Sequence, residues 1–324
     1  MDSLFYLKKA DMKNVVLMAV AMLVAVACGQ SYEEQKRLSR SERQRLAKEN
    51  EAALKIAVMP TLDCLPLYVA RQYHLFDSLG ADVRLKLYNA QMDCDTALVN
   101  KRVEGAVTDM VRATRMETLG TPLVYITTTN AYWQLITNRI ARIKELKQLN
   151  DKMIAMTRYS VTDMLADHAV DSARLISEMV FRIQVNDVDV RLRMLQNNEM
   201  DAVLLTEPQA TVARMQKNPV LMDSRKVGMK MGVIAARQEA RNDTARQKQW
   251  NVLLKAYNMA CDSINKHGLK HYSQLISQYC KVNAAVVNAL PADLKFAHAT
   301  PPRKEDKERA AEWLAKKVDS DEIK

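Results

Sequence analysis

Residues 54–88 read LKIAVMPTLDCLPLYVARQYHLFDSLGADVRLKLY. The short apolar run at 54–59 ends at Pro60, and such a run before a turn signal is typical of a buried strand. Residues 66–76 repeat apolar side chains with a helical period, whereas residues 81–89 alternate as a strand does. A strand, a helix and a second strand at this spacing predict a βαβ unit and a parallel sheet.

The same alternation continues, and it is interrupted once by a second block of the same kind. We expect strands at 103–110, 122–130, 151–158, 181–187, 200–208 and 227–237, and helices at 95–102, 144–150, 161–170, 188–198 and within 244–289. This order predicts an α/β fold with two lobes, each a mainly parallel sheet flanked by helices. We place lobe 1 at 54–128 and 227–324 and lobe 2 at 132–222, joined by two crossing segments.

An apolar run near the N-terminus, VVLMAVAMLVAVA at 15–27, begins after a lysine and ends before Cys28. Its length fits a secretory signal and is short of the ~20 residues of a spanning helix. We therefore expect a signal peptide at 1–27 and a lipid on Cys28. An ordinary cleaved signal and an uncleaved anchor are the alternatives. Residues 28–53 are polar and charged, which predicts a solvated tether or surface helix next to the membrane.

Length and composition limit the possible classes of protein. Removal of residues 1–27 from the 324 leaves 297, which is large for one core and favours two lobes. The chain is 48% hydrophobic and carries 48 Lys and Arg against 38 Asp and Glu, a net charge of +10. A basic balance fits nucleic acid or an anionic membrane, but an exported chain without a nucleic-acid motif argues against nucleic acid. With only 5 His in the chain, we expect no metal site, and we also expect no cofactor.

The cysteines permit two disulfide bridges. With Cys28 assigned to lipid, four of the five remain, and an exported protein meets an oxidising compartment. Cys64 and Cys94 each follow a predicted strand, while Cys261 and Cys280 lie in the helical C-terminal part. These positions suggest the pairs Cys64–Cys94 and Cys261–Cys280, with four buried thiols as the alternative.

Five stretches together resemble the type 2 periplasmic substrate-binding proteins of ABC importers, in particular the branch of thiamine-pyrimidine, sulfonate and nitrate binders. They are residues 54–88, ALVNKRVEGAVTDMVRA at 97–113, IKELKQLNDKMIAMTRYSVTDML at 143–165, MLQNNEMDAVLLTEPQATVA at 194–213 and ALPADLKFAHATPPRKEDKERAAEWL at 289–314. The resemblance covers most of residues 54–314. It implies the two-lobed fold, a ligand cleft between the lobes and an ABC permease as partner.

Two turn positions depart from the family's pattern. The family usually has glycine where His74 and Asn198 stand. Histidine and asparagine tolerate positive φ better than most residues, so we expect both turns to survive.

Candidate ligand contacts come from the loops that follow the strands. In an open α/β sheet, ligands bind beyond the carboxyl ends of the strands, where helix N-termini present free N–H groups. Four loops meet this condition, and an aromatic pair follows the strand expected to cross between lobes. The candidate residues are Thr61, Leu62, Asp63, Thr108, Asp109, Tyr132, Trp133, Arg158, Tyr159, Ser160, Val161 and Glu207.

Each candidate also has a purely structural interpretation. Asp63 and Asp109 could cap helices, and Ser160 with Asp163 matches a capping box. Glu207 could serve a neighbouring loop, and Trp133 and Tyr132 could pack in the core. Capping and ligand contact are compatible, so these interpretations stay open.

The charges on these loops bear on the ligand. Asp63, Asp109 and Glu207 outnumber Arg112 and Arg158. A carboxylate near a helix N-terminus cancels the field that would attract an anion. We therefore expect a cationic or amine-bearing ligand, such as an aminopyrimidine, in preference to sulfonate or nitrate.

These observations favour a lipid-anchored, monomeric solute-binding component of an ABC importer in the cell envelope, and not an enzyme. One alternative is an enzyme of the same fold that acts on a pyrimidine-like metabolite, although such enzymes carry a Cys-rich motif that is missing here. The other is an envelope lipoprotein that binds a protein partner through its basic C-terminal residues, including Arg303, Lys304 and Lys307.

Overall fold

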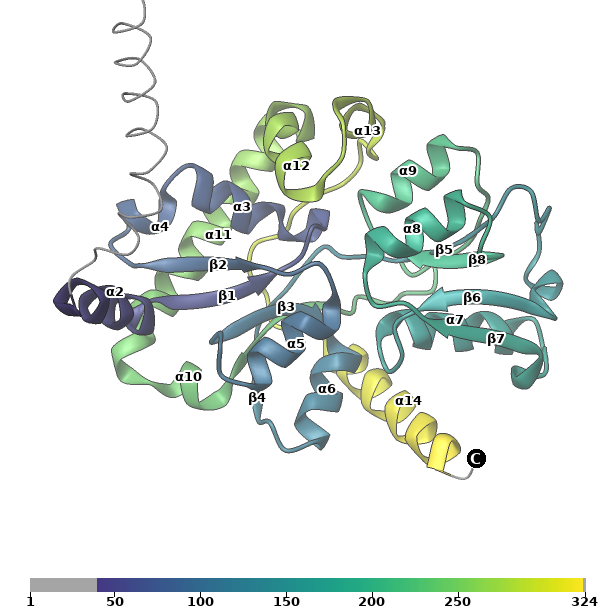
Figure 1. The fold of residues 1–324 in the computed structure, drawn as a ribbon, viewed down its shortest axis with the longest axis horizontal. Helices are drawn as coiled ribbons and strands as arrows, with labels where there is room; N and C mark the ends of the chain where they lie inside the picture. Colours follow the sequence, from purple (N-terminus) through teal and green to yellow (C-terminus); the bar gives the residue numbers. More distant parts are fainter. Residues whose placement is uncertain (1–39, 323–324) are drawn as a thin grey trace, which may run out of the picture. The chain divides into compact units, whose positions relative to one another are not determined.

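The computed structural model describes residues 40–322, in which one compact unit ends at Ala53 and another begins at Leu54 (Figure 1). The first unit contains the polar helix α2 (Arg40–Ala52), whose residues 42–50 are exposed. The predicted signal peptide, Cys28 and the first part of the tether lie outside the described residues. Among residues 40–322, no helix combines the length and the apolar character needed to cross a bilayer.

The first sheet of the second unit has five strands, of which four are parallel. Its order is β2 (Val83–Leu87), β1 (Leu54–Val58), β3 (Gly105–Asp109), β10 (Gly232–Arg237) and β4 (Leu123–Thr128), with β10 antiparallel to both neighbours. Side chains alternate along a strand. Ile56 therefore faces a core with Tyr68 and Trp250, whereas Ala57 faces a second core with Leu98 on the other side of the sheet.

Helices cover both faces of this sheet (Figure 1). They are α3 (Leu65–Gln72), α4 (Leu75–Ser78), α5 (Gln91–Val99), α6 (Met110–Thr118), α10 (Gln238–Asn242), α11 (Gln247–His267), α12 (Ser273–Cys280) and α13 (Ala284–Ala289). The helix expected at 66–76 is divided into α3 and α4 by His74, which has a φ of 52°. Asn198 has a φ of 62°, so both turn predictions are confirmed.

The second sheet repeats this plan. Its order is β7 (Val180–Gln184), β6 (Lys152–Met156), β8 (Ala202–Leu205), β5 (Gln134–Thr137) and β9 (Val220–Asp223), with β5 antiparallel to both neighbours. The helices α7 (Val161–Ser172), α8 (Val188–Gln196) and α9 (Gln209–Met215) flank it. Sequence patterns miss β5 and β9, and the helix expected at 144–150 is a 3-10 turn at Leu146–Leu149.

Two segments cross between the sheets. Residues 129–133 lead from β4 to β5, and residues 224–231 lead from β9 to β10. The amide of Thr129 donates to the carbonyl oxygen of Gly232 at 2.8 Å. A Cβ atom on Gly232 would collide with Thr129 Oγ1 and Ala131 Cβ, so glycine is needed for this close crossing. The fold is thus the expected two-lobed α/β architecture, and below "first lobe" and "second lobe" mean the two sheets with their helices.

The last helix, α14 (Lys304–Glu322), contacts both lobes. Its residues Ala310 and Leu314 share a buried cluster with Val111 of the first lobe and Leu165 of the second. The indole Nε1 of Trp313 donates to Asp167 Oδ2 in α7 at 3.1 Å. The C-terminus therefore forms a link between the lobes in addition to the two crossing segments.

The expected disulfide bridges are not formed. Cys64, Cys94, Cys261 and Cys280 are all buried and free. Cys64 packs in the core on one face of the first sheet and Cys94 in the core on the other face, which explains why adjacent strand ends do not bring their side chains together. Burial is the main cause that raises the pKa of the Cys64 thiol well above its usual range, so it stays protonated.

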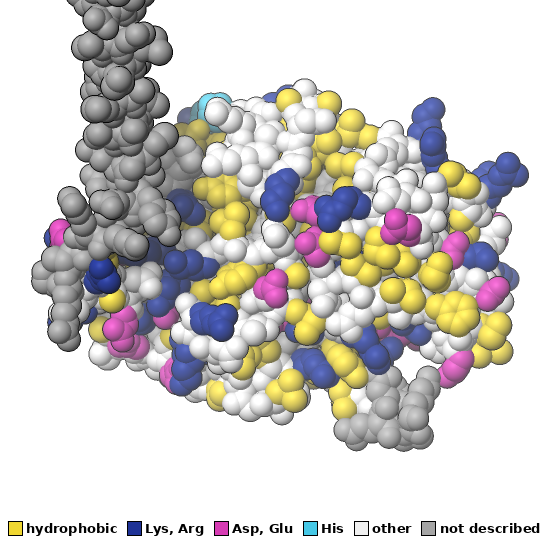
Figure 2. Space-filling view, in the orientation of Figure 1, with side chains coloured by type: hydrophobic (Ala, Val, Ile, Leu, Met, Phe, Trp, Pro, Cys, Tyr) yellow, Lys and Arg dark blue, Asp and Glu magenta, His cyan; other side chains and the backbone are white. Residues whose placement is uncertain are grey.

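Basic side chains do not gather in one place on the surface shown in Figure 2. Lys and Arg side chains are scattered over the described part of this face, with acidic and apolar side chains between them. A protein that follows a nucleic-acid backbone presents a basic patch or stripe. The net positive charge is therefore dispersed on this face.

Candidate ligand-binding site

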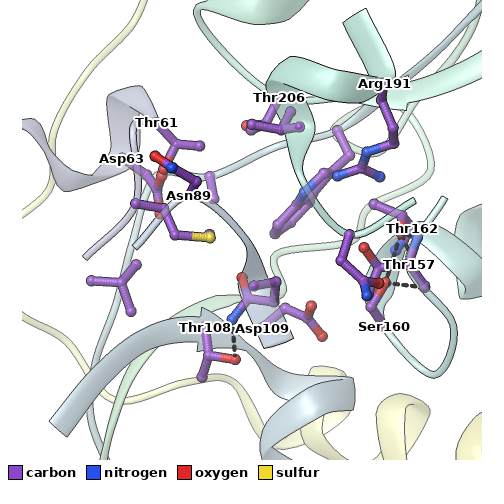
Figure 3. Close-up of a pocket in the computed structure, with 17 residues that line it drawn as sticks. Thr61, Asp63, Asn89, Thr108, Asp109, Thr157, Ser160, Thr162, Arg191 and Thr206 are labelled. Atoms are coloured by element: carbon purple, nitrogen blue, oxygen red, sulfur yellow. Dashed lines mark hydrogen bonds between the residues drawn. The ribbon is translucent and has the colours of Figure 1, made fainter. Parts of the chain in front are cut away.

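A cavity of about 40 Å³ lies where the carboxyl ends of β1 and β3 meet those of β6 and β8 (Figure 3). This is where the architecture of open α/β sheets places ligands. At roughly 10–15 Å³ for each water molecule, the cavity has room for about three. The space between the lobes is thus small, and many of the residues that line it carry polar side chains.

Half of the residues that the sequence predicted as ligand contacts line the cavity. Those that line it are Thr61, Asp63, Thr108, Asp109, Trp133 and Ser160. The structure leaves the others outside its lining: Leu62, Tyr132, Arg158, Tyr159, Val161 and Glu207. Lining residues that sequence reasoning did not single out include Asn89, Gln91, Thr157, Asn186 and Arg191.

Asp63 lies on the wall of the cavity formed by the first lobe. Its side chain is 8% exposed, and Oδ2 accepts a hydrogen bond from Thr129 Oγ1 at 3.1 Å. Burial is the largest influence on this carboxyl and raises its pKa above the usual value. Burial therefore disfavours the charged form of Asp63.

A buried ion pair supports the same wall. Arg112 Nε donates to Asp95 Oδ2 at 2.6 Å, and Thr108 Oγ1 donates to Asp95 Oδ1 at 3.2 Å. The side-chain nitrogen Nε2 of Gln91 donates to Thr108 Oγ1 at 2.9 Å. Arg112, counted above among the cationic residues of the loops, is thus neutralised by Asp95.

Asp109 joins the two walls. It is the N-cap of α6, and its Oδ1 accepts from the backbone amide of Arg112 at 3.0 Å and from that of Val161, in the second lobe, at 3.2 Å. Burial raises the pKa of this carboxyl to about 7, although these amides and the charge of Arg112 act in the opposite direction. Asp109 therefore caps a helix, as the structural interpretation held, and also lines the cavity.

Ser160 caps α7 on the wall formed by the second lobe. Its Oγ accepts from the amide of Thr162 at 3.0 Å and donates to the carbonyl oxygen of Thr157 at 2.7 Å. Asp163 Oδ2 accepts from the amide of Tyr159 at 2.9 Å. In a capping box it would accept from the amide of Ser160 itself. The predicted cap is present, but this reciprocal contact is shifted by one residue.

Arg191 was not predicted. It projects from α8 into the cavity (Figure 3), and it is 5% exposed. Its Nε and Nη1 have no hydrogen-bond partner among residues 40–322. Burial lowers the pKa of its guanidinium to about 10, against the attraction of Asp187. The sequence does contain a signal, because Arg191 stands among the buried residues Val188, Leu192 and Leu195 of an amphipathic helix.

Glu207 is directed away from the cavity, contrary to its predicted role as a ligand contact. It is 2% exposed and accepts from Tyr132 Oη, Thr211 Oγ1 and Arg214 Nη2, each at 2.6 Å. The Arg225 guanidinium lies 3.7 Å from the centre of the Tyr132 ring. Glu207 and Tyr132, which were both predicted to contact the ligand, therefore stabilise the second lobe next to the crossing segments.

Tyr132 lines a separate, larger hollow of about 450 Å³ beside the crossing segments. This hollow adjoins the smaller cavity, because Ala131 lines both. The smaller cavity also contains two side chains with unpartnered buried atoms, Thr157 and Arg191. The larger hollow has one such side chain, Asn130. Buried polar groups are almost always paired, so the two in the smaller cavity make it the stronger candidate site.

Comparison with known proteins agrees with this geometry. A family model described as NMT1/THI5 like matches residues 61–263, well over half of the chain. The chain belongs to the NMT1/THI5-like family. The matched range includes residues of both walls of the cavity. A search of curated proteins gave no match.

Solved structures with the same fold include two periplasmic binding proteins. The aliphatic sulphonate binding protein SsuA from Escherichia coli has a TM-score of 0.69 at 15% identity, over 83% of this NMT1/THI5-like chain and 92% of SsuA. The nitrate-binding protein NrtA from Synechocystis PCC 6803 has a TM-score of 0.65 at 14% identity, over 82% and 80% of the two chains. At these identities the likeness establishes the periplasmic binding protein fold.

The lobes of this NMT1/THI5-like protein also touch directly around the cavity. The amide of Leu62 donates to the carbonyl oxygen of Glu207 at 2.8 Å, and Gln209 Nε2 donates to that of Pro60 at 3.0 Å. Arg112 Nη1 donates to the carbonyl oxygen of Arg158 at 3.2 Å. These contacts hold the two walls together beside the cavity.

The candidate site offers no group of metal ligands. Among the described residues, no three His, Cys, Asp or Glu side chains lie close enough together to hold a metal ion. The polar groups of the lining are hydroxyls, amides, two carboxyls, one guanidinium and the indole N–H of Trp133. Such a set can bind a small molecule through hydrogen bonds and charge.

Proposed function

We propose that this protein is the solute-binding component of an ABC importer, anchored by lipid on Cys28, that captures a small molecule between its lobes and delivers it to a permease. The observation that carries the proposal is the cavity at the strand ends, which is lined by side chains of both lobes and flanked by hydrogen bonds between them. Family membership and the fold support it. Closure is then a population shift, because a solute that contacts both walls favours the closed state.

An enzyme on the same fold is the second candidate function. Ser160 is the hydroxyl of the lining best placed at a helix N-terminus, but its Oγ donates to the carbonyl oxygen of Thr157. An activated serine would instead donate to a general base. This contact favours a structural cap and hence the solute-binding proposal.

The sequence favoured an amine-bearing heterocycle as the ligand, because acidic residues outnumber basic ones on the loops. The structure gives this ligand class less support. Glu207 is paired with Arg214, and burial raises the pKa of both Asp63 and Asp109. Hydrogen bonds to these two carboxyls could still hold an amine. The field in the cavity no longer selects for a cation, because Arg191 offsets the two carboxyls.

A thermal-shift screen of the full chain against a metabolite panel tests the function. A solute that binds should stabilise the protein by ~2.7 kcal/mol at a hundredfold excess over Kd. Asp63→Asn should weaken the affinity of that solute roughly tenfold, as expected for the loss of a charged hydrogen-bond acceptor. The matched control is Asp77→Asn, because the Asp77 side chain is 71% exposed on α4. A panel in which nothing stabilises the protein would refute the proposal.

The lipid anchor gives a separate prediction. Cys28→Ser should release the protein from membranes and leave its melting temperature unchanged, because residues 29–53 contain no second apolar run. Fractionation of cells that express the variant measures the release, with Gln30→Ser as the neighbouring control. If the Cys28→Ser protein resists an alkaline wash of the membranes, the lipid assignment is wrong.

A further inference from the structure

Arg191 is a buried cation without a hydrogen-bonded partner. Arginine remains protonated in proteins and carries five N–H donors. Its residue is 5% exposed, and its Nε and Nη1 have no acceptor within the described residues. Asp187 lies one turn earlier, but its Oδ1 accepts from the amides of Asp189 and Val190 at 2.8 and 3.0 Å as the N-cap of α8.

Such an arrangement is costly in the absence of a ligand. A charge removed from water without a partner destabilises a protein by several kcal/mol. Buried charges are therefore paired, unless the partner arrives from outside. Figure 3 shows the side chain of Arg191 directed into the cavity, so a bound molecule can supply that partner.

Thr157 provides a second, independent observation. It follows β6, its residue is 2% exposed, and its Oγ1 has no hydrogen-bond partner. The neighbouring hydroxyls of Ser160 and Thr162 lie 2.7 Å apart and both can donate to the carbonyl oxygen of Thr157. Thr157 lines the same cavity as Arg191, and its hydroxyl can donate to an anion.

We propose that Arg191 and Thr157 anchor an oxyanion head group, such as a carboxylate or a sulfonate, on the ligand of this cavity. The inference rests on the proposed solute-binding function and names the chemistry of its ligand. Hydrogen bonds between a guanidinium and an oxyanion are roughly twice as strong as neutral ones, and water-poor surroundings strengthen them further. A head group of three or four heavy atoms suits a cavity of about 40 Å³.

The two walls of the cavity differ in charge, which gives the ligand an orientation. Asp63 and Asp109 belong to the first lobe, whereas Arg191 and Thr157 belong to the second. The oxyanion head therefore lies against the second lobe, and the rest of the ligand faces the carboxyls of the first. The ligand class expected from counting charges, a cation, is thereby replaced by an acid.

Matched pairs of small probes test the proposal on the full chain. Acetate is compared with acetamide, and methanesulfonate with methanesulfonamide, by thermal shift and calorimetry at constant ionic strength. We expect at least one acid to bind and its neutral amide not to bind. Arg191→Met should weaken binding of the acid roughly 10- to 100-fold, the effect of losing hydrogen bonds to a charged group. Arg193→Met, an exposed arginine of the same helix, should have no effect.

A ligand-free measurement distinguishes a binding role from a structural one. Without any probe, Arg191→Met should melt at a higher temperature than the wild type, because an unpaired buried charge is removed. A structural arginine would give the opposite result. Thr157→Val removes only a hydroxyl and should weaken binding of the acid roughly 3- to 10-fold. This variant keeps the test decisive if Arg191→Met does not fold.

Three outcomes would overturn the inference: acid and amide bind equally well, Arg191→Met binds the acid as the wild type does, or neither acid binds. The proposed function survives these outcomes if a metabolite of the larger panel still binds to both wild type and Arg191→Met. If no solute of any class binds, the proposed function itself fails.

Discussion

Glu207→Ala should lower the free energy of unfolding by about 3–5 kcal/mol, as expected when one partner of a buried ion pair is removed. Without the carboxylate, Arg214 and the hydroxyls of Tyr132 and Thr211 lose a shared acceptor. The Arg214 side chain is 26% exposed, so water can solvate part of its charge. The loss should therefore lie toward the lower end of this range.

Urea unfolding measures the effect of this substitution. Glu199→Ala is the control, because it removes an exposed glutamate from the same lobe and should change stability by less than about 0.5 kcal/mol. Equal stability of the two variants would mean that Glu207 does not support the fold. It would also restore the role of a ligand contact that the sequence suggested.

Asp109→Asn should stabilise the protein at pH 8 and have little effect at pH 4. The pKa of Asp109 is about 7 in the folded protein, whereas the ordinary value for an aspartate is 3.8. Its favourable contribution to stability is therefore complete below pH ~3.8 and is lost as the pH rises through about 7. At pH 8 the buried charge costs up to ~4 kcal/mol at 1.36 kcal/mol per pH unit. Asparagine avoids this cost and keeps an oxygen for the amides of Arg112 and Val161.

The difference in unfolding free energy between Asp109→Asn and wild type, measured in urea from pH 4 to pH 8, gives the result directly. We expect this difference to grow with pH. Asp171→Asn, at an exposed position near the end of α7, controls for the loss of an ordinary aspartate. A difference that stays constant over this range would show that Asp109 titrates with an ordinary pKa.

Apolar periodicity predicted most of the fold but missed β5 and β9. Strands such as β1 are buried along their whole length and consist mainly of apolar residues, so they are recognised easily. β5 begins and ends with the polar residues Gln134 and Thr137, yet all of it is buried. Gln134 donates to Asp223 Oδ2 at 2.7 Å and accepts from Arg214. Polar residues that are buried by hydrogen bonds to residues distant in sequence do not produce an alternating apolar pattern, so the sequence gives no sign of the strand.

The rule that ligands lie beyond strand ends led to the cavity, but it could not give the directions of the side chains. It identified Asp63 and Asp109, which line the cavity. The same rule, if applied to the ends of β2 and β7, would also have identified Asn89 and Asn186. It failed for Glu207, whose side chain turns to Tyr132 and Arg214.

Charge counting failed for a related reason. A count treats each charged residue alike, whereas the structure neutralises Arg112 with Asp95 and Glu207 with Arg214. Arg191 was absent from the count because it lies inside a helix and not in a loop. Which charges stay uncompensated depends on tertiary pairing, and that information is not present in local sequence.

The three tryptophans of the chain lie in three different environments. Trp133 lines the cavity, Trp313 is hydrogen-bonded to Asp167 across the lobes, and Trp250 is fully buried in the first lobe with its Nε1 donating to Ala240 at 2.9 Å. Intrinsic fluorescence can therefore follow this protein without an added dye. Emission from Trp133 responds to an occupant of the cavity, emission from Trp313 responds to separation of the lobes, and Trp250 serves as an internal reference.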